Sequence, residues 1–460
     1  MVTPITGRSP DGDSWTFGQS KTFLLTSLLG DSILYNILAT GLKGEQPLVP
    51  ITVALFERDL SVKKILRITF IVLGSLVAVL VVIWLAAHLF TGSSQWARAI
   101  VWLQSDIQDY KRFPAREVPN AGPVFNFKQP STQTNQRIAA ALENITYIKN
   151  GQAVTESLDK FLAANDTVAF LIIQDDEILY EKYFNGYTHD SIVTSFSMAK
   201  SFDSALVGAA IADGYIAGLD DPVTKYVPEL LEKNPRYANI TLRNLVSMSS
   251  GICYSEMGMP WSDDASTYYN PNLRQVAISS PICNEPGEEF LYNNFHPLLI
   301  GLVLERATGR PVAQYLSEKI WQPLGMEAPA TWSLDSNQNG FEKMESGING
   351  RAIDFAKFGR LFLNNGNWDG RQILPASWVE ESTRLDTTTD PALYYQYFWW
   401  VNPITDDHQF YAAGMHGQYI YIIPEQNMIL MRFGSSDPLH GAWSRELFGL
   451  LAQQIEQSNP

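Results

Sequence analysis

The sequence predicts an α/β (α+β) protein in which an antiparallel sheet is flanked by helices, joined to a helical subdomain and preceded by one transmembrane helix. Three observations lead to this fold class. Strand-like segments occur early and late in the chain, at 168–184 and 410–434, and helix-like segments fill most of the sequence between them. An uninterrupted apolar run at 68–90 precedes all of these segments. One sheet built from both ends of a folded domain, with a helical insertion, satisfies this order.

The apolar run Ile68–Phe90 contains no Asp, Glu, Lys or Arg over about 23 residues, which is long enough to cross a bilayer with some tilt. Because basic residues precede the run, the positive-inside rule places residues 1–67, a segment of uncertain structure, in the cytoplasm. A cleaved signal peptide fits less well, since the run is too long and no small-x-small cleavage site follows it. We therefore expect a single-pass protein of the inner (cytoplasmic) membrane whose folded domain faces the periplasm or the cell exterior. The basic residues are Arg58, Lys63, Lys64 and Arg67.

The segment after the span is expected to be a stalk and arm over residues 91–132, because it is irregular with scattered Pro and Gly. A helix at 135–149 and a hairpin follow, in which VAFLIIQ and ILYEKYF flank the turn signal Asp175-Asp176. The stretch 194–214 then carries apolar residues at helical spacing. Further helices are expected at 226–231, 242–248, 298–308, 312–320, 353–364 and 443–454, and strands at 410–415, 418–424 and 428–434.

This order of elements divides the exported part into two regions. Residues 133–218 and 351–460 form the predicted sheet domain, and residues 219–350 form the helical subdomain. We expect a functional site in the cleft between them.

Composition and charge exclude several classes of function. The 460 residues include 48 acidic and 33 basic side chains, for a net charge of −15, so no basic surface for nucleic acid is implied. The six histidines are scattered and no His-Glu-x-x-His occurs, so a zinc site is not expected. No phosphate-binding or dinucleotide-binding glycine motif is present. We therefore expect no metal and no cofactor.

Cys253 and Cys283 are the only two cysteines of the sequence, and both lie on the expected exported side. An oxidising compartment allows them to pair, and their even number and modest separation favour a disulfide. Two free buried thiols are the alternative, because the sequence does not give the geometry.

A serine and a lysine three residues apart, Ser197 and Lys200, begin the predicted buried helix at 194–214. Residues at this spacing are neighbours on one helix face, so the amine is expected beside the hydroxyl. A serine hydroxyl needs a nearby base to become a good nucleophile, and a desolvated lysine can act as that base. The spacing alone is not specific, since Ser-x-x-Lys also occurs at Ser61 and Ser157.

Several sequence segments resemble, in the expected order, the serine beta-lactamase/penicillin-binding-protein superfamily. The similarity covers residues 115–456 and points to the class C-like branch, which includes 6-aminohexanoate-dimer hydrolases, family VIII-type esterases and D-amino-acid-specific peptidases. It implies a beta-lactamase/transpeptidase-like fold and Ser-x-x-Lys as the nucleophile motif. The segments are SFSMAKSF, LDDPVTKYVPEL, LVSMSSGI, PGEEFLYNN, PLGM and AAGMHGQYIYIIP.

The second catalytic element of that branch is Tyr-x-Asn, which the resemblance places at Tyr292-Asn293-Asn294. The pattern also occurs elsewhere, but the preceding Pro-Gly-Glu and the helix that follows select Tyr292. The resemblance implies that Tyr292 and Lys200 form the acid/base pair and that Asn294 holds Lys200 or a substrate carbonyl. A core aromatic residue is the alternative for Tyr292. The other occurrences begin at Tyr183, Tyr237 and Tyr268.

The third element, Lys-Thr-Gly on a strand, is altered to Met415-His416-Gly417 if Gly417 matches the motif glycine. The change removes a cation that beta-lactamases use near the substrate carboxylate, so beta-lactams become doubtful substrates. The resemblance implies an oxyanion hole made by the backbone N–H groups of Ser197 and Gln418. His416 is expected to hydrogen-bond the substrate or Tyr292, with a structural histidine as the alternative.

These inferences predict a membrane-anchored serine hydrolase that cleaves small esters or amides through an acyl-enzyme on Ser197. One alternative is a class C-like beta-lactamase or D,D-peptidase. Another is a non-catalytic binding protein that retains the fold, which the complete Ser/Lys/Tyr set disfavours. The run Phe398-Trp399-Trp400 either lines a pocket or belongs to the core, and the core is favoured.

Overall fold

The computed structural model describes residues 51–91, 94–149, 152–385, 392–403, 408–438 and 442–459. Residues 1–50 of the predicted cytoplasmic segment 1–67 therefore lie outside the described residues. The chain divides into two compact units, Met1–Val77 and Ala78–Pro460, and each is described by itself. The predicted boundaries between arm, sheet domain and helical subdomain stay predictions.

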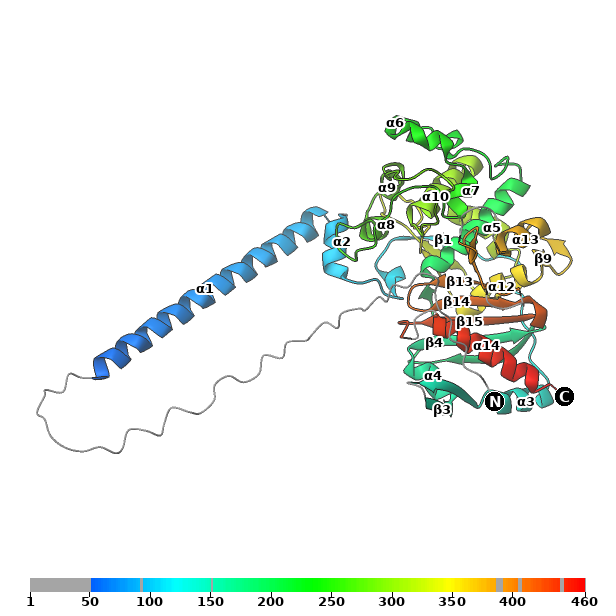
Figure 1. Ribbon diagram of the computed structural model, residues 1–460, viewed down its shortest axis with the longest axis horizontal. Helices are drawn as coiled ribbons and strands as arrows, with labels where there is room; N and C mark the ends of the chain where they lie inside the picture. Colours follow the sequence, from blue (N-terminus) through cyan, green and yellow to red (C-terminus); the bar gives the residue numbers. More distant parts are fainter. Residues whose placement is uncertain are drawn as a thin grey trace, which may run out of the picture. The chain divides into compact units, whose positions relative to one another are not determined.

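Helix α1, Ile51–Thr91, is the first described element (Figure 1). Its segment Val62–Ala86 has a mean hydropathy of 2.9 over its most apolar window, and none of that window is buried. By length and composition, these 25 residues can cross a membrane. The helix begins before the predicted span at 68–90 because the preceding segment is also rich in helix-forming residues.

Within the described residues, seven strands form an antiparallel sheet in the order β11-β12-β13-β14-β15-β4-β5. β4 and β5 form a hairpin, and Asp175 and Asp176 adopt the positive φ angles, 52° and 62°, that its two-residue turn needs. β15 pairs with β4, so both ends of the folded domain contribute to the sheet, as the sequence predicts. The strands are β4 Thr167–Gln174, β5 Glu177–Tyr183, β11 Tyr395–Gln396, β12 Trp399–Val401, β13 Phe410–Gly414, β14 Gln418–Ile423 and β15 Met428–Gly434.

The two faces of this sheet pack against different helices. Phe170 and Ile172 of β4 pack with α3, α4 and α14, whereas Leu171 and Ile173 join the main core with α5, α10 and α12. Successive side chains of a strand point to opposite faces, so this continuously apolar strand is buried on both. Figure 1 shows α14 lying across the sheet. The helices are α3 Thr132–Ala141, α4 Leu158–Ala164, α5 Ala199–Ala212, α10 Phe295–Thr308, α12 Ala352–Leu363 and α14 Ala442–Gln457.

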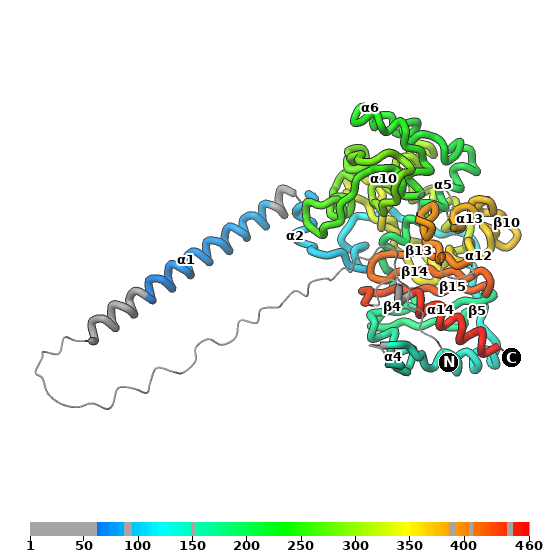
Figure 2. The backbone as a smooth tube through the Cα atoms, in the orientation of Figure 1, coloured from blue at the N-terminus to red at the C-terminus, as the bar shows by residue number. Residues whose placement is uncertain are grey.

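The chain between α5 and α12 forms a second region beside the sheet (Figure 2). This region is mainly helical, but it also contributes two strands to a four-stranded sheet of order β1-β7-β8-β6. The region contributes β7 Ala330–Ser333 and β8 Ile348–Gly350. The other two strands of this sheet are β1 Ala115–Val118 and β6 Val193–Thr194. Besides α10, the helices of the region are α6 Leu230–Lys233, α7 Leu242–Val246, α8 Asp263–Tyr269, α9 Leu273–Ile278 and α11 Val312–Leu316.

Three predicted elements differ from the structure. The helix expected at 135–149 ends at Ala141, and β2 (Asn144–Lys149) follows and pairs with β3 (Gln152–Ser157). The helix expected at 226–231 is replaced by a 3-10 turn, Val223–Lys225, and α6, because Pro228 cannot continue a helix. The arm at 91–132 is not irregular throughout, since it contains α2 (Gln95–Trp102) and β1. The remaining elements are β9 Asn367–Trp368, β10 Arg371–Gln372 and α13 Ala376–Thr383.

Candidate active site

Ser197 lies in a 3-10 turn, Phe196–Met198, that leads directly into α5. Phe196 has a positive φ of 48°, an uncommon conformation for a non-glycine residue that is often kept at functional sites. The turn is held at its start by the Ser195 amide, which donates to the Ile348 carbonyl at 2.8 Å. Residues 199–210 of α5 are buried, so the half-buried Ser197 sits where a core helix reaches the surface.

Lys200 is placed beside Ser197 as the helical spacing predicts. Its Nζ donates to the Ser197 Oγ at 2.9 Å and to the Glu345 carbonyl oxygen at 3.1 Å. The side chain is only 1% exposed. The amine is therefore held against the serine hydroxyl inside the protein, which is the position that a base for this serine needs.

Tyr292 lies on the other side of Lys200, whose Nζ is 4.9 Å from the centre of the tyrosine ring. The ring of Tyr292 stacks on Trp400 of β12 at 5.7 Å and meets Tyr395 of β11 edge-on at 5.9 Å. These two aromatic side chains fix the plane of the tyrosine beside the lysine. Of the predicted aromatic run, Trp399 is a core residue, whereas the half-buried Trp400 contacts Tyr292.

The two asparagines after Tyr292 have different environments. Asn293 is buried and anchors the start of α10, since it accepts from the Phe295 amide at 2.8 Å and donates to the Ile252 carbonyl at 2.9 Å. Asn294 donates to the Tyr254 hydroxyl at 2.7 Å. Its Oδ1 is buried and has no hydrogen-bond partner among the described residues. The geometry thus pairs Asn294 with Tyr254, whereas the resemblance implied Lys200 or a substrate carbonyl.

The strand edge beside Ser197 belongs to β13. The Asn402 amide donates to the Gln409 carbonyl, so the backbone groups of alternate residues of β13, including Ala413, face β12. The pairing of β12 with β13 covers only Phe410 and Tyr411, so Ala413 lies at an open part of this edge, and Met415 follows it at the start of the turn after β13. A Cβ atom at Gly414 would lie 3.2 Å from the Met198 amide nitrogen, so this edge adjoins the turn that carries Ser197.

Gln418 does not share that edge. It lies on β14 opposite Gly414, where its backbone faces β13 within the sheet. Its side chain is fully buried and makes two hydrogen bonds with the Gly434 backbone, at 2.7 and 3.0 Å. The geometry therefore favours the Met415 N–H, rather than the predicted Gln418 N–H, as the strand's oxyanion donor.

His416 and Gly417 form the turn between β13 and β14. The His416 Nε2 lies 3.1 Å from the Ser105 carbonyl oxygen, and its ring meets Phe196 edge-on at 5.0 Å. Burial lowers the pKa of His416, so the neutral ring donates to Ser105. The Gly417 carbonyl accepts from Arg432 at 2.7 Å. Among the described residues, His416 thus connects the arm to the Ser197 turn and has no hydrogen bond to Tyr292.

A group of buried charges lies behind Lys200. Asp203, one helical turn further along α5, is fully buried, and neither of its carboxyl oxygens has a hydrogen-bond partner among the described residues. Burial raises the pKa of Asp203 well above its usual value, although the nearby Lys200 charge lowers it in part. Glu345, whose carbonyl binds Lys200, is itself paired with Lys343 at 2.8 Å. Burial lowers the pKa of Lys343.

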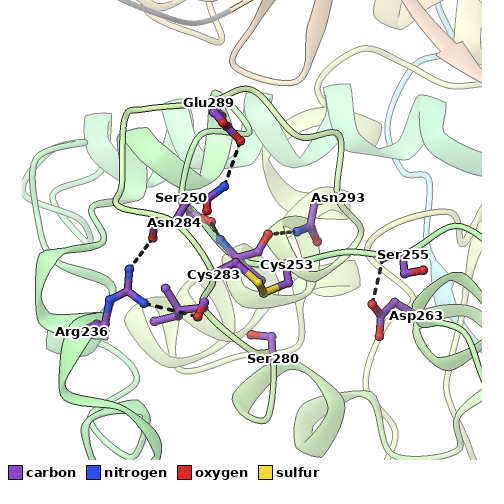
Figure 3. The surroundings of a disulfide bond; sticks show 12 residues. Arg236, Ser250, Cys253, Ser255, Asp263, Ser280, Cys283, Asn284, Glu289 and Asn293 are labelled. Carbon is purple, nitrogen blue, oxygen red and sulfur yellow. Dashed lines mark hydrogen bonds between the residues drawn. A yellow bond between two sulfur atoms is a disulfide. The ribbon is translucent and has the colours of Figure 1, made fainter.

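Cys253 and Cys283 are joined by a disulfide with a Cα–Cα distance of 5.4 Å (Figure 3). The bond connects the loop that carries Tyr254 to the segment that leads to Tyr292. Backbone hydrogen bonds support it on both sides, from Cys253 to the Pro281 carbonyl and from Cys283 to the Gly251 carbonyl, each 2.9 Å. The disulfide therefore limits the movement of two segments that border the site.

Sequence reasoning located Ser197, Lys200 and Tyr292 but missed several neighbours. Glu345 and Ser105 contribute backbone carbonyls, which leave no signal in a sequence. The sequence did contain a signal for Asp203, because this acidic residue, three positions after Lys200, interrupts a predicted helix of otherwise apolar and small residues. Within the described ranges, no group of three or more His, Cys, Asp or Glu residues could hold a metal ion.

A half-buried serine in contact with a buried lysine at the start of a core helix, beside the open edge of an antiparallel sheet, is the arrangement expected of a serine hydrolase of the beta-lactamase/transpeptidase fold. The family model described as Beta-lactamase matches residues 156–448, and the chain belongs to this family. These findings agree with the resemblance seen in the sequence.

Relatives with named activities support the same class. The 6-aminohexanoate-dimer hydrolase of Paenarthrobacter ureafaciens is 27% identical over 316 residues, covering 64% of this chain and 79% of the relative. Esterase EstB of Burkholderia gladioli is 31% identical over 153 residues, covering 30% of this chain and 38% of the esterase. A solved structure assigned as a 6-aminohexanoate-dimer hydrolase from Bacillus anthracis is 26% identical, with a TM-score of 0.66 over 77% of this chain and 94% of that chain.

Proposed function

We propose that this protein is a membrane-anchored serine hydrolase that cleaves small esters or amides through an acyl-enzyme on Ser197. The observation that carries the proposal is the 2.9 Å contact between the buried Lys200 amine and the Ser197 hydroxyl at the start of α5. A binding protein has no need to bury a lysine against an accessible serine, because that burial costs free energy.

The acylation step follows from these positions. The Lys200 amine accepts the Ser197 proton while the Oγ attacks the substrate carbonyl carbon. The oxyanion that forms is stabilised by the N–H groups of Ser197 and Met415. The carbon–leaving-group bond then breaks, and Tyr292, resupplied by Lys200, gives a proton to the departing alcohol or amine. Water attacks the resulting ester of Ser197 by the reverse proton path, which releases the acid and restores the serine.

The substrate class is inferred from the surroundings of this centre. Tyr292 and Trp400 supply an aromatic wall, and Met415 places an uncharged side chain next to the strand edge. An uncharged wall suits a neutral acyl chain better than the carboxylate of a beta-lactam. The names of the relatives, an amide hydrolase and an esterase, agree with small esters and short amides as substrates, including aminohexanoate-type and D-amino-acid amides.

The proposed membrane anchor is α1. Its apolar segment Val62–Ala86 can cross a membrane, and the basic side chains of Lys63, Lys64 and Arg67 lie at the N-terminal end of that segment. The positive-inside rule then places the catalytic part on the periplasmic or external side of the cytoplasmic membrane. An oxidising compartment on that side would also preserve the disulfide.

Hydrolysis of a short-chain p-nitrophenyl ester by the full chain in detergent micelles tests the proposed chemistry. We expect Ser197→Ala to reduce turnover to background and Tyr292→Phe to lower kcat by about 10²-fold. Ser157→Ala is the matched control, because Ser157 begins another Ser-x-x-Lys sequence and should leave turnover unchanged. Equal turnover by the parent and a folded Ser197→Ala variant would refute the assignment. A fluorophosphonate should label the peptide containing Ser197 and no other serine.

A further inference from the structure

Helix α2 presents an apolar face that the rest of the described structure does not cover. Trp96 and Ile100 are four residues apart, which places them on one side of the helix, and Leu103 follows at the C-cap of α2. Their side chains are 51%, 55% and 76% exposed. Val101 is also exposed, and Trp261 of the loop before α8 lies beside Trp96, with ring centres 6.1 Å apart. We call these five residues the α2 surface.

The opposite side of α2 fixes the helix to the catalytic domain. Ala97, Arg98 and Ala99 are buried. The guanidinium of Arg98 donates to the backbone carbonyls of Tyr269 and Asp335, at 3.2 and 2.6 Å. The α2 surface is therefore held in a set orientation, and it is not the face of a loosely attached segment.

The α2 surface continues to the edge of the active site. Two residues after Leu103, the Ser105 hydroxyl lies 3.1 Å from the sulfur of Met415, and the Ser105 carbonyl binds His416. Met415 is 59% exposed and follows Gly414, which packs against the turn that carries Ser197. The α2 surface is thus connected to the proposed oxyanion edge through Ser105.

The position of α2 in the chain indicates what covers this surface. Helix α1 ends at Thr91, and only residues 92–94 separate it from α2, so the connection spans at most about 10 Å. The candidate span ends at Ala86, about 8 Å of helix before Thr91. Whatever bilayer α1 crosses must therefore have its interface close to α2.

The composition of the surface fits that interface. Tryptophan is enriched where a membrane meets water, because its ring is apolar and its N–H is polar. None of the five residues of the α2 surface is charged, so the attraction would come from apolar burial and not from anionic lipid headgroups. Single exposed apolar residues are common on soluble proteins, but a contiguous group with two tryptophans marks an interaction site.

We propose that the α2 surface docks on the interface of the bilayer that α1 crosses, so that the active site opens at the lipid–water boundary and takes amphiphilic acyl esters or amides. This inference rests on the proposed membrane anchor and names the substrate class of the proposed active site. Docking at this place brings Met415 and the Ser197 turn within reach of acyl chains that are partly embedded in lipid.

The contact is tested with the full chain reconstituted into phosphatidylcholine vesicles. An environment-sensitive fluorophore is attached at Ile100→Cys, and the matched control carries it at Ile148→Cys on β2, another exposed isoleucine that is not part of the α2 surface. The two native cysteines are bonded to each other and stay unlabelled. We expect blue-shifted emission that doxyl lipids quench at Ile100, and water-like emission that iodide quenches at Ile148.

The substrate class is tested with Ile100→Glu and the matched Ile148→Glu. We expect Ile100→Glu to lose roughly tenfold in kcat/KM on a long-chain acyl ester embedded in vesicles, about 1.4 kcal/mol, because a charge now opposes docking. Its rate on a soluble short-chain ester should equal that of the parent, as should both rates of Ile148→Glu. An equal loss on both substrates, or none on either, overturns the proposal.

Three other outcomes contradict the docking. Iodide quenching at Ile100 would place the surface in water. Emission at Ile100 that changes when the protein is diluted in lipid would identify a second copy of the chain as the occupant. Release of the full chain by alkaline carbonate would refute the anchor and the docking together, whereas Ser197-dependent hydrolysis of the soluble ester would still support the proposed chemistry.

Discussion

The backbone of Gly414 touches the backbone of Ser195: a Cβ atom built on Gly414 would lie 2.3 Å from the Ser195 carbonyl oxygen. Strand β13 therefore meets the turn of the nucleophile main chain against main chain, with no side chain between them. Any other residue at position 414 would have to separate the two. Because Ser197 and Met415 flank this contact, it sets the distance between the two proposed oxyanion donors.

Gly414→Ala is therefore expected to impair catalysis more than substrate binding. Displacement of one oxyanion donor should lower kcat by about 10²-fold, since such a donor acts mainly on the transition state. KM for a short ester should change little. Steady-state kinetics on the full chain measure both. Gly218→Ala is the control, because a Cβ at Gly218 meets nothing within 4 Å. A folded Gly414→Ala variant with parental kcat would contradict the assigned geometry.

Asp203→Asn should change the way stability depends on pH. Burial raises the pKa of Asp203, so the folded chain keeps this proton at pH values where the unfolded chain has lost it, above about 3.9. The folded state then binds more protons, and the free energy of unfolding falls as pH rises, by up to about 1.4 kcal/mol per unit. Asparagine has the same shape and no charge, so the free energy of unfolding of the variant should decrease less steeply as pH rises.

Urea unfolding of parent and variant at pH 5 and pH 8 measures this difference. The stability of Asp203→Asn relative to the parent should increase with pH. Asp220→Asn is the control, because hydrogen bonding to Arg243 lowers the pKa of the exposed Asp220, so its contribution changes only below the unfolded value of about 3.9 and the relative stability of this variant should be the same at pH 5 and pH 8. A relative stability of Asp203→Asn that stays constant or decreases with pH would show that Asp203 is ionised in the folded protein.

Reduction of the Cys253–Cys283 disulfide should destabilise the protein and impair the site. The bond closes a loop with a sequence separation of 30, for which the chain-entropy model gives about 3–4 kcal/mol. Activity should decrease as well, because the segment after Cys283 leads to Tyr292. The urea midpoint and the ester hydrolysis rate, each with and without dithiothreitol, are the measurements. The double variant Cys253→Ser, Cys283→Ser should not respond to reductant, and a parent that is equally insensitive would argue against a stabilising role.

The sequence was sufficient where structure depends on local patterns. Ser197 and Lys200 meet because a helix brings residues three apart together, and the β4–β5 hairpin follows from apolar strands around two aspartates. The strand at 144–149 was also marked, by the Asn150-Gly151 pair that follows it and is typical of hairpin turns. Its apolar spacing was compatible with a helix too, which is why it was predicted wrongly.

Contacts between distant segments were beyond the sequence. Two glycines, Gly414 and Gly417, lie in one short stretch, and only the pairing of β13 with β14 shows which of them adjoins the Ser197 turn. Because Gly414 is the glycine that adjoins this turn, the proposed oxyanion donor of the strand is the Met415 N–H and not the Gln418 N–H. In the same way, the partner of Asn294 is a tyrosine 40 residues away, and no motif encodes that distance.

His296 should make the fold sensitive to acid, and its replacement should relieve this. The side chain is buried beside the Ser250 hydroxyl, and burial together with the Lys200 charge lowers the pKa of His296 to about 3. The unfolded chain takes up this proton near pH 6.5, so the free energy of unfolding decreases between pH 6.5 and pH 3, by up to about 1.4 kcal/mol per unit. His296→Asn cannot be protonated and should show a shallower decrease, measured by urea unfolding at pH 7 and pH 4.5. His408→Asn, at an exposed histidine, is the matched control. An unchanged slope in His296→Asn would mean that His296 is already protonated in the folded protein. A buried charge at His296 would cost free energy, because no described acidic residue contacts this side chain.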